Sequence, residues 1–521
     1  MNDDRISRYL NQQADGIALS SADPADVMRR GGRRRTRRRA ALVGSVAAVG
    51  LLATSVAVRD SGNGQEVRSL GASATASTYD WSTVTPASGL GYGSHSAQLA
   101  DGSVYSISTA PGPYQPDGPQ SQFASTLYRS TDGSEWSAAS LPSGVRSSDL
   151  AGAGDTLYSV GTAPSGGLVL SASTDGAASW TSASLPDDVV ALQARHPGQI
   201  IAGPARVAAR DGSHVVATIV ATTQLDLTKL GHPEYPNDSY TWDWTDTGVT
   251  VSKTPISSCG TTDPVALDKE AGIACREDVK TKVGDQVASY TYDELGVTGE
   301  LRDHVGGKSY VYASDDGHTF DRVDLPAEVT SHGVGGFVAT PAATADGYRL
   351  VTSSYEARAT TSTILASTDG RTWTIEATLP GSPNDVGVLN GRLALSTWSD
   401  QGASSVKVEQ ADGSFSTLDL ASAVATPAGA STSVDTVSFG PLGIAAVVGT
   451  AKEGGPYVQH IVHSADGATL QVQDVASLVH NGGQVVGLLV TPDAIVARVT
   501  TPGDDDVSTP PTQEVLVGTP R

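Results

Sequence analysis

The chain has 521 residues, enough to bury a large core in several small domains or in one large repeat fold. Glycine (57 copies) and proline (27 copies) are frequent, aromatic residues make up only 5%, and short runs of Val, Thr, Ser and Ala recur, which favours β-structure with many turns over a helical bundle. Residues 1–39 carry ten arginines against five aspartates, so the rest of the chain holds a net charge of −27 within the total of −22, and such an acidic body is a poor binder of nucleic acid.

The first predicted element is a membrane-spanning helix over residues 40–58. Eight arginines lie between Arg29 and Arg39, and the next nineteen residues carry no charge. A helix of that length spans about 28 Å, close to the ~30 Å hydrocarbon layer. The arginines predict that residues 1–39 are a cytoplasmic basic segment and that the acidic body is extracytoplasmic, in a single-pass protein of the cell membrane. The alternative is a signal peptide cleaved after the small residues Ser55-Val56-Ala57, which would give a secreted protein.

The segment after the span, residues 59–78, is small and polar, with little to bury. Such a composition predicts a flexible stalk. The repeats described next begin at Tyr79 and continue to the end of the chain, so residues 79–521 are expected to form the folded body.

A turn sequence of the form Ser-x-Asp-Gly followed by an aromatic residue recurs through this body. Asp and Gly supply a tight hairpin turn, and the aromatic residue packs under the next layer. In four of the six copies Leu-Pro follows, and the proline ends the strand. We expect the aspartates to stabilise their turns, with catalysis or calcium binding as the minority alternative. They are Asp132, Asp175, Asp316, Asp369, Asp412 and Asp466.

Apolar strand pairs alternate with these turns, and seven such pairs are present against six Asp-type turns. One unit therefore lacks its outer strand at the C-terminal end, and residues 79–86 (YDWSTVTP) supply a matching strand. Two hairpins per unit in seven units predict an all-β fold, a seven-bladed β-propeller of four-stranded blades closed by the N-terminal strand. A pair of ordinary β-sandwiches, the alternative, explains neither the register nor the closing strand.

The turns resemble the Asp-box (BNR) repeats of sialidase-like β-propellers. Residues 130–136 (STDGSEW) and 367–373 (STDGRTW) carry the resemblance best, although most copies are one residue shorter than the usual pattern. In that family the box is a structural turn between the two outer strands of a blade, so the resemblance implies a fold and not an activity. The chain also resembles exported, membrane-anchored propellers of actinobacterial type.

One blade carries an insertion at about residues 225–307, between its second and third strands. In a propeller these connections emerge on the face opposite the boxes, near the axial mouth. A loop of this length is usually functional or has structure of its own. We expect it to bind a ligand through its aromatic residues Trp242, Trp244, Tyr290 and Tyr292, and packing of the two tryptophans in the insertion's own core is the alternative.

Both cysteines of the chain, Cys259 and Cys275, lie in this insertion. In an exported protein they predict a local disulfide, with two free thiols as the alternative. A metal site would need further Cys or His at ligand spacing, so no metal or other cofactor is expected.

The sequence contains no recognised catalytic motif, and the Arg-Ile-Pro segment of sialidases is absent. Four carboxylates of the insertion, Asp293, Glu294, Glu300 and Asp303, could supply the pair that a glycosidase needs. We therefore predict a membrane-tethered extracytoplasmic propeller that acts as a binding or scaffold module for a protein or a cell-surface glycan. The alternative is a sialidase-like or other glycoside hydrolase acting on extracellular polysaccharide.

Overall fold

The computed structural model describes most of residues 68–521. The described ranges are 68–70, 75–84, 95–110, 124–133, 135–163, 167–224, 240–244, 247–253, 267–268, 273–274, 286–330, 338–356, 359–398, 404–452, 457–479, 483–501 and 512–521. The predictions for residues 1–39, for the span 40–58 and for Cys259 and Cys275 lie outside the described residues. Within the described ranges, no helix combines the length and the apolar character needed to cross a membrane.

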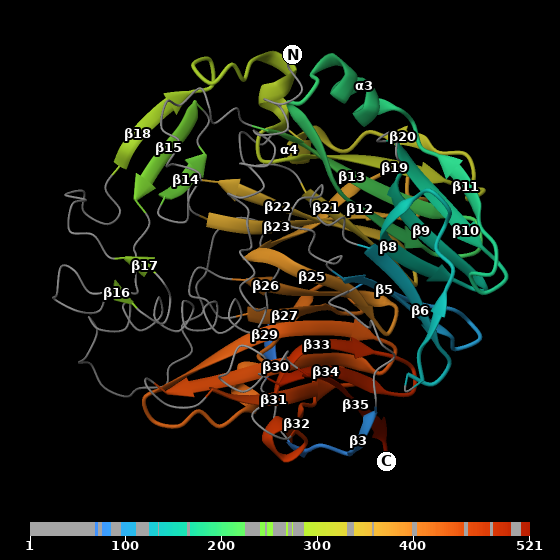
Figure 1. Cartoon of the computed structure of the whole chain (residues 1–521), viewed down its shortest axis with the longest axis vertical. Coiled ribbons are helices and arrows are strands. Elements are labelled where there is room, and N and C mark those ends of the chain that lie inside the picture. Colours follow the sequence, from blue (N-terminus) through green and yellow to red (C-terminus); the bar gives the residue numbers. More distant parts are fainter. Residues whose placement is uncertain are drawn as a thin grey trace.

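The chain folds into an all-β propeller of seven blades, each a four-stranded antiparallel sheet (Figure 1). This architecture confirms the predicted number of blades and of strands in a blade. Blade 1 consists of β4 (His95–Gln98), β5 (Val104–Ala110), β6 (Ala124–Ser130) and β7 (Ser137–Ala139). Blade 2 consists of β8 (Arg146–Ala153), β9 (Thr156–Thr162), β10 (Leu168–Ser173) and β11 (Thr181–Ser184). Blade 3 consists of β12 (Ile200–Ala209), β13 (Val215–Thr223), β19 (Lys308–Ser314) and β20 (Asp321–Val323).

The other four blades repeat this order, and in most successive blades the first strands contact each other at the inner side of the ring. Blade 4 consists of β21 (Val338–Thr344), β22 (Gly347–Glu356), β23 (Ala359–Ser367) and β24 (Thr374–Pro380). Blade 5 consists of β25 (Ser382–Leu389), β26 (Arg392–Trp398), β27 (Ser404–Glu409) and β28 (Phe415–Leu418). Blade 6 consists of β29 (Ala430–Gly440), β30 (Gly443–Lys452), β31 (Tyr457–Ser464) and β32 (Gln471–Asp474). Blade 7 consists of β33 (Gln484–Val490), β34 (Ile495–Thr501), β35 (Thr512–Pro520) and β3 (Tyr79–Val84).

The ring is closed by the N-terminal strand, as the sequence predicted. Strand β3 pairs antiparallel with β35, from Tyr79 opposite Pro520 to Val84 opposite Val515. Figure 1 shows β3 beside β35 at the C-terminal end of the chain. Antiparallel pairing gives β35 a partner on both sides and leaves no gap in the last blade.

Part of the segment expected to be a flexible stalk is paired with the blades. Strand β1 (Arg68–Leu70) lies parallel to β28, and β2 (Thr75–Ala76) lies parallel to β32. These short pieces add a fifth strand to blades 5 and 6, because the open edge of an outer strand offers backbone groups to any extended segment. With β3 they form a belt, which we define as the described residues 68–70 and 75–84, along the outer edges of blades 5, 6 and 7.

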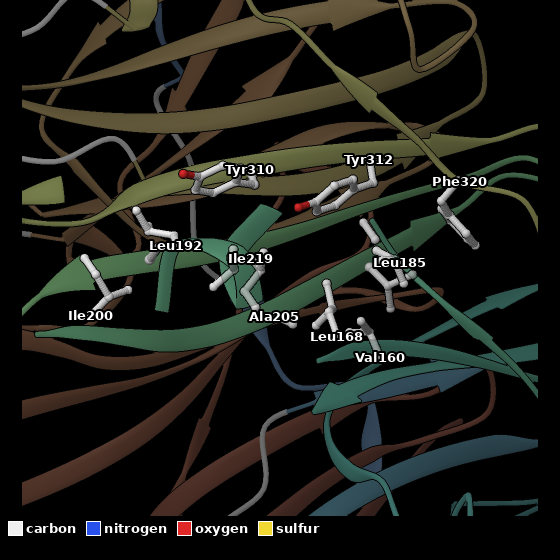
Figure 2. Packing of buried hydrophobic residues seen from close by; sticks show 14 of the residues in the cluster. Val160, Leu168, Leu185, Leu192, Ile200, Ala205, Ile219, Tyr310, Tyr312 and Phe320 are labelled. Atoms are coloured by element: carbon white, nitrogen blue, oxygen red, sulfur yellow. The ribbon is translucent and has the colours of Figure 1, made fainter. Parts of the chain in front are cut away.

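The core lies between blades, where each sheet packs against the next. The second strand of a blade is buried on both faces, so β30 consists largely of small apolar residues. The largest hydrophobic cluster lies between blades 2 and 3. Figure 2 shows Tyr310 and Tyr312 lying over the aliphatic side chains of Ile219, Leu192 and Leu185 in this cluster.

The insertion leaves blade 3 after β13 and returns at β19, between its second and third strands. It contains a three-stranded antiparallel sheet of β14 (Tyr240–Trp244), β15 (Gly248–Lys253) and β18 (Gln286–Thr291), which lies apart from the blades in Figure 1. A two-stranded pair of β16 (Leu267–Asp268) and β17 (Ile273–Ala274) and the 3-10 helix η2 (Gly299–His304) complete its described part. The other helices of the described ranges are α3 (Asp188–Arg195), α4 (Ala327–Thr330), η3 (Ala421–Ala423) and η4 (Val475–Ser477).

Candidate functional site

The connections between strands divide the propeller into two rims. A Cβ atom on Gly317, in the box turn of blade 3, would lie 3.1 Å from Tyr158 Oη. The same Tyr158 hydroxyl donates to the carbonyl oxygen of Gly212 (2.8 Å), in the turn between β12 and β13. The box turns and these inner turns therefore share one rim, the box rim. The insertion leaves blade 3 at the opposite end of its strands, which we call the insertion rim.

Each aspartate of the box rim bonds to its own turn. In blade 4 the hydroxyl of Ser367 donates to Asp369 Oδ1 (2.9 Å), which also accepts the backbone N–H of Thr372 (2.8 Å). Gly370 supplies a positive φ of 75°, and the indole N–H of Trp373 donates to its carbonyl oxygen (3.0 Å). The turn uses the carboxylate for its own backbone, which is the arrangement expected of a structural turn.

In four of the six boxes, hydrogen bonds of the turn lower the pKa of the aspartate. The hydroxyl and backbone N–H of Ser179 lower the pKa of Asp175 to about 2. The backbone N–H groups of Thr372 and Arg371 lower the pKa of Asp369 in the same way. An ionised carboxylate that accepts several hydrogen bonds is a poor proton donor.

On the insertion rim, charged groups attach the returning end of the insertion to helix α3, which lies in the connection between blades 2 and 3. Glu300 accepts two hydrogen bonds from the Arg195 guanidinium, at 2.7 and 3.1 Å, and lies 3.2 Å from His196 Nε2. The hydroxyl of Thr223, at the end of β13, donates to the carbonyl oxygen of Leu301 (2.6 Å). These bonds fix η2 against α3 and against the strand from which the insertion departs.

Two of the four aromatic residues predicted to bind a ligand are part of the core packing. Tyr292 is 2% exposed and belongs to the cluster between blades 2 and 3, with the Arg302 guanidinium 5.4 Å from its ring centroid. Tyr290 is half-buried and packs against the same cluster. Burial in this cluster leaves the ring of Tyr292 little surface for a ligand, and ligand binding by these aromatic residues stays a prediction.

The tryptophans of the insertion lie on a strand whose register is defined. Trp244 pairs with Val249, which in turn pairs with Tyr290, and Trp242 pairs with Val251. Residues paired across strands share one face of a sheet, and Val249 on this face is fully buried in the core cluster. The side chains of Trp242 and Trp244 lie outside the described part of the chain, so ligand binding by the two tryptophans remains a prediction.

Two of the candidate catalytic carboxylates are engaged with neighbours. Glu294 accepts the backbone N–H and the hydroxyl of Thr291, at 2.7 and 2.8 Å, and these bonds lower its pKa. The hydrogen bond from Arg195 lowers the pKa of Glu300 to about 2. A glycosidase needs one carboxyl group with a raised pKa as its general acid, so these two residues are unsuited to that role.

Five of the inner strands are interrupted by a β-bulge in their first half. The register shifts lie in blades 2, 3, 5, 6 and 7, at Ser147/Asp149, Ala202/Ala205, Pro383/Asp385, Val434/Thr436 and Val485/Gly487. A bulge turns a side chain out of the alternation of its strand and is common beside binding sites. In blades 5 and 6 the extra residues are polar, Asn384 and Asp435.

The bulge of blade 6 contacts an aromatic residue that the sequence analysis missed. Tyr457, the first residue of β31, donates a short hydrogen bond from its hydroxyl to the carboxylate of Asp435 and lies 3.3 Å from the hydroxyl of Ser433. Among the described side chains Tyr457 is the exposed aromatic, at 36%. The buried Val434 and Val437 are three residues apart instead of two, and this break in alternation is the signal that could have found the bulge.

The comparisons with known proteins concern the overall fold. No family model matches the chain, and no curated protein matches it. Among solved structures, a puromycin hydrolase mutant is similar with 13% identity and a TM-score of 0.38 over 79% of this chain and 50% of its own. Trypanosoma rangeli sialidase in complex with sialic acid is similar with 11% identity and a TM-score of 0.33 over 81% of this chain and 59% of its own. A streptogramin B lyase is similar with 11% identity and a TM-score of 0.33 over 84% of this chain and 97% of its own. The chain thus spans about half the length of the hydrolase.

Proposed function

We propose that this propeller is a membrane-tethered extracytoplasmic module that binds or scaffolds a protein or a cell-surface glycan at its insertion rim. The observation that carries the proposal is the attachment of the insertion. Its return is fixed by Glu300 to Arg195 and by Leu301 to Thr223, so the small sheet is supported at its base. A supported arm on one rim loses little conformational freedom when a partner binds.

The electrostatics of the insertion support binding over hydrolysis. Both Glu294 and Glu300 have pKa values below their usual range, with hydrogen-bond donors already in place. Charge pairs of this kind hold a loop in one position, whereas a general acid needs a carboxyl group that keeps its proton near neutral pH. A glycoside hydrolase is therefore the less favoured reading, and the experiment below includes it as an outcome.

The tether is proposed at residues 40–58, with the N-terminus in the cytoplasm. The belt follows it along the chain, and the described part of the belt is attached to the outer edges of blades 5, 6 and 7. A protein anchored in this way would hold its propeller close to the outer surface of the membrane, where a surface glycan or protein is within reach.

The proposal is tested by immobilising the full-length chain and measuring the retention of solubilised cell-surface proteins and glycans. The variant is Trp242→Ala with Trp244→Ala, and the matched control is Ile375→Ala, an exposed apolar residue (44%) on the outer strand β24. We expect the double variant to lose retention and to keep its melting temperature, and the control to retain its ligand. A fall in melting temperature with retention intact assigns the tryptophans to packing.

The same preparation separates binding from hydrolysis. Incubation with a panel of polysaccharides should release no more reducing sugar than a heat-inactivated sample. Release above that level would contradict the binding proposal in favour of a glycoside hydrolase, and failure of the wild-type chain to retain any surface component would contradict it outright.

A further inference from the structure

We propose that the insertion rim carries a subsite for one pyranose ring of a neutral polysaccharide, with Tyr457 as its stacking platform. The subsite consists of Tyr457, Asp435 and Ser433 of blade 6. This inference rests on the proposed binding function and names the class of ligand.

The ring of Tyr457 is held in one orientation. It lies over Gly449 of β30, where any Cβ atom would overlap the phenol end of the ring, so only glycine permits this position. Its hydroxyl is bound by Asp435 at the bulge of the inner strand. With the ring fixed by its hydroxyl on one side and by the sheet below it, little side-chain entropy remains to be lost on binding.

The location and exposure of this ring suit a ligand that approaches the insertion rim. Tyr457 begins the third strand of blade 6 and pairs with Ala451 near the end of the second strand, β30. The insertion connects the second and third strands of blade 3, so both lie at the same rim of the propeller. At 36% exposure the ring keeps apolar surface in contact with water. The C–H face of a pyranose can cover such a surface and release that water.

Polar groups beside the ring match the hydroxyl groups around the edge of a sugar. The Ser433 hydroxyl donates to Asp435 Oδ1 (3.0 Å), and the carboxylate presents further acceptor positions. A carboxylate and a hydroxyl together can accept from and donate to vicinal hydroxyls.

The charge of the site selects against anionic polysaccharides. Asp435 places a carboxylate beside the ring, and the whole chain has a net charge of −22. A ligand that carried uronate or phosphate groups would meet like charge both at the site and over the long range. The ligand class is therefore a neutral polysaccharide.

Affinity electrophoresis of the full-length chain tests this subsite. Gels contain a soluble β-glucan, a mannan, a galactan or, as the anionic comparison, polygalacturonate. We expect at least one neutral polysaccharide to retard the wild-type chain and polygalacturonate to have no effect. Tyr457→Ala should weaken the retardation about tenfold or more, and Tyr457→Phe, which keeps the ring, should lose less.

A second variant separates the position of the ring from its presence. Gly449→Ala leaves Tyr457 in the chain and displaces its ring, so it should weaken binding as Tyr457→Ala does, while melting temperature reports that both variants are folded. Ile375→Ala, exposed on β24, is the matched control and should bind like the wild type.

The outcomes distinguish this subsite from the proposed function as a whole. Wild-type retardation by a neutral polysaccharide that Tyr457→Ala and Gly449→Ala leave unchanged would overturn the subsite and keep the binding function. Retention of a surface protein, with no retardation by any neutral polysaccharide, would also overturn the subsite and keep the binding function. Stronger retardation by polygalacturonate than by the neutral polysaccharides would overturn the ligand class.

Discussion

The box turns depend on single residues whose backbone and side chain act together. In blade 4 Asp369 accepts the backbone N–H groups of Arg371 and Thr372, each at 2.8 Å, and the Gly370 backbone has a positive φ. The box of blade 2 is one residue longer, and there the non-glycine Ala177 adopts a φ of 68°. A side chain costs about 1 kcal/mol or more in that conformation, so the hydrogen bonds of the turn must offset strain at this position.

Removing the carboxylate of one box tests this account at the residue scale. We expect Asp369→Ala to lower the free energy of unfolding by about 1 to 2 kcal/mol, because two backbone N–H groups and a hydroxyl lose their acceptor. Urea denaturation measures the change. The control is Asp493→Ala, an exposed aspartate in the turn between β33 and β34, and an equal loss in both variants would contradict a special role of the box.

Among the elements, the return of the insertion is held by side chains from neighbouring elements as well as by its own backbone. Helix η2 has six residues, and a helix so short has little stability of its own. Leu301 within it is buried in the core cluster, and Glu300 is bonded to Arg195 at the end of α3. The position of the arm therefore depends on the contact of η2 with α3, a helix in the connection between blades 2 and 3.

Glu300→Gln tests this attachment. Loss of the ion pair should speed hydrogen exchange of the backbone amides of residues 299–307 roughly two- to fivefold, the range that a partly exposed ion pair produces. Exchange in blades 5 and 6 should not change. Asp303→Asn, in the same helix, is the control. Equal acceleration in both variants would show that the loss of charge, and not this contact, loosens the helix.

For the whole molecule, closure of the ring joins residues that are almost 400 positions apart. Tyr79 of β3 packs edge-on against His463 of blade 6, with ring centroids 4.9 Å apart and its hydroxyl 3.2 Å from His463 Nε2. That nitrogen also lies 2.9 Å from the carbonyl oxygen of Leu442. Burial lowers the pKa of His463 and raises the pKa of Tyr79 to about 12. The carboxylate of Asp466 is the charged group that acts on the histidine, and it raises the pKa of His463 against the effect of burial.

The buried histidine makes closure sensitive to acid. Its pKa is lower in the folded chain than in the unfolded chain, so the unfolded chain binds the proton first and stability falls as pH drops below about 6.5. We expect His463→Gln to reduce the slope of the unfolding free energy between pH 7.5 and 5 by up to about 1.4 kcal/mol per pH unit. Urea denaturation at several pH values measures this slope.

Two further histidines bear on this measurement, one as a second contributor to the slope and one as the control. His304 is also buried with a lowered pKa, so it contributes a slope of the same sign, and the variant should reduce the slope without removing it. His318→Gln, at an exposed position in the box of blade 3, is the control. A slope that is unchanged in His463→Gln would contradict the role of this residue in closure.

Much of the architecture could be predicted because its signals are local. The Asp-Gly turns, the apolar pairs between them and the extra strand at residues 79–86 identified seven blades and the closing strand, since hairpin chemistry and period-two patterning need only neighbouring residues. The pairing of β1 and β2 could not be predicted in this way. Their short, polar segments show no alternation, and they become strands because blades 5 and 6 have open edges.

The candidate site was less accessible to sequence reasoning. The insertion was found from its length, and Glu300 was named as a carboxylate. Its partner Arg195 lies 105 positions earlier, in the helix between blades 2 and 3, and carries no signal of the contact. Tyr292 was predicted to bind a ligand, and its burial in the core cluster depends on contacts between residues that are distant in sequence. Tyr457 was missed because its platform needs Gly449 and Asp435, which only strand pairing brings beside it.

The sequence by itself determined the blade number, the turn chemistry, the closing strand and the place of the insertion, because each depends on the order of neighbouring residues along the chain. Only the tertiary structure decided which side chains meet between blades and where inner strands bulge. Those contacts depend on the register and packing of sheets distant in sequence, and burial then decides which polar groups are engaged and which remain available to a ligand.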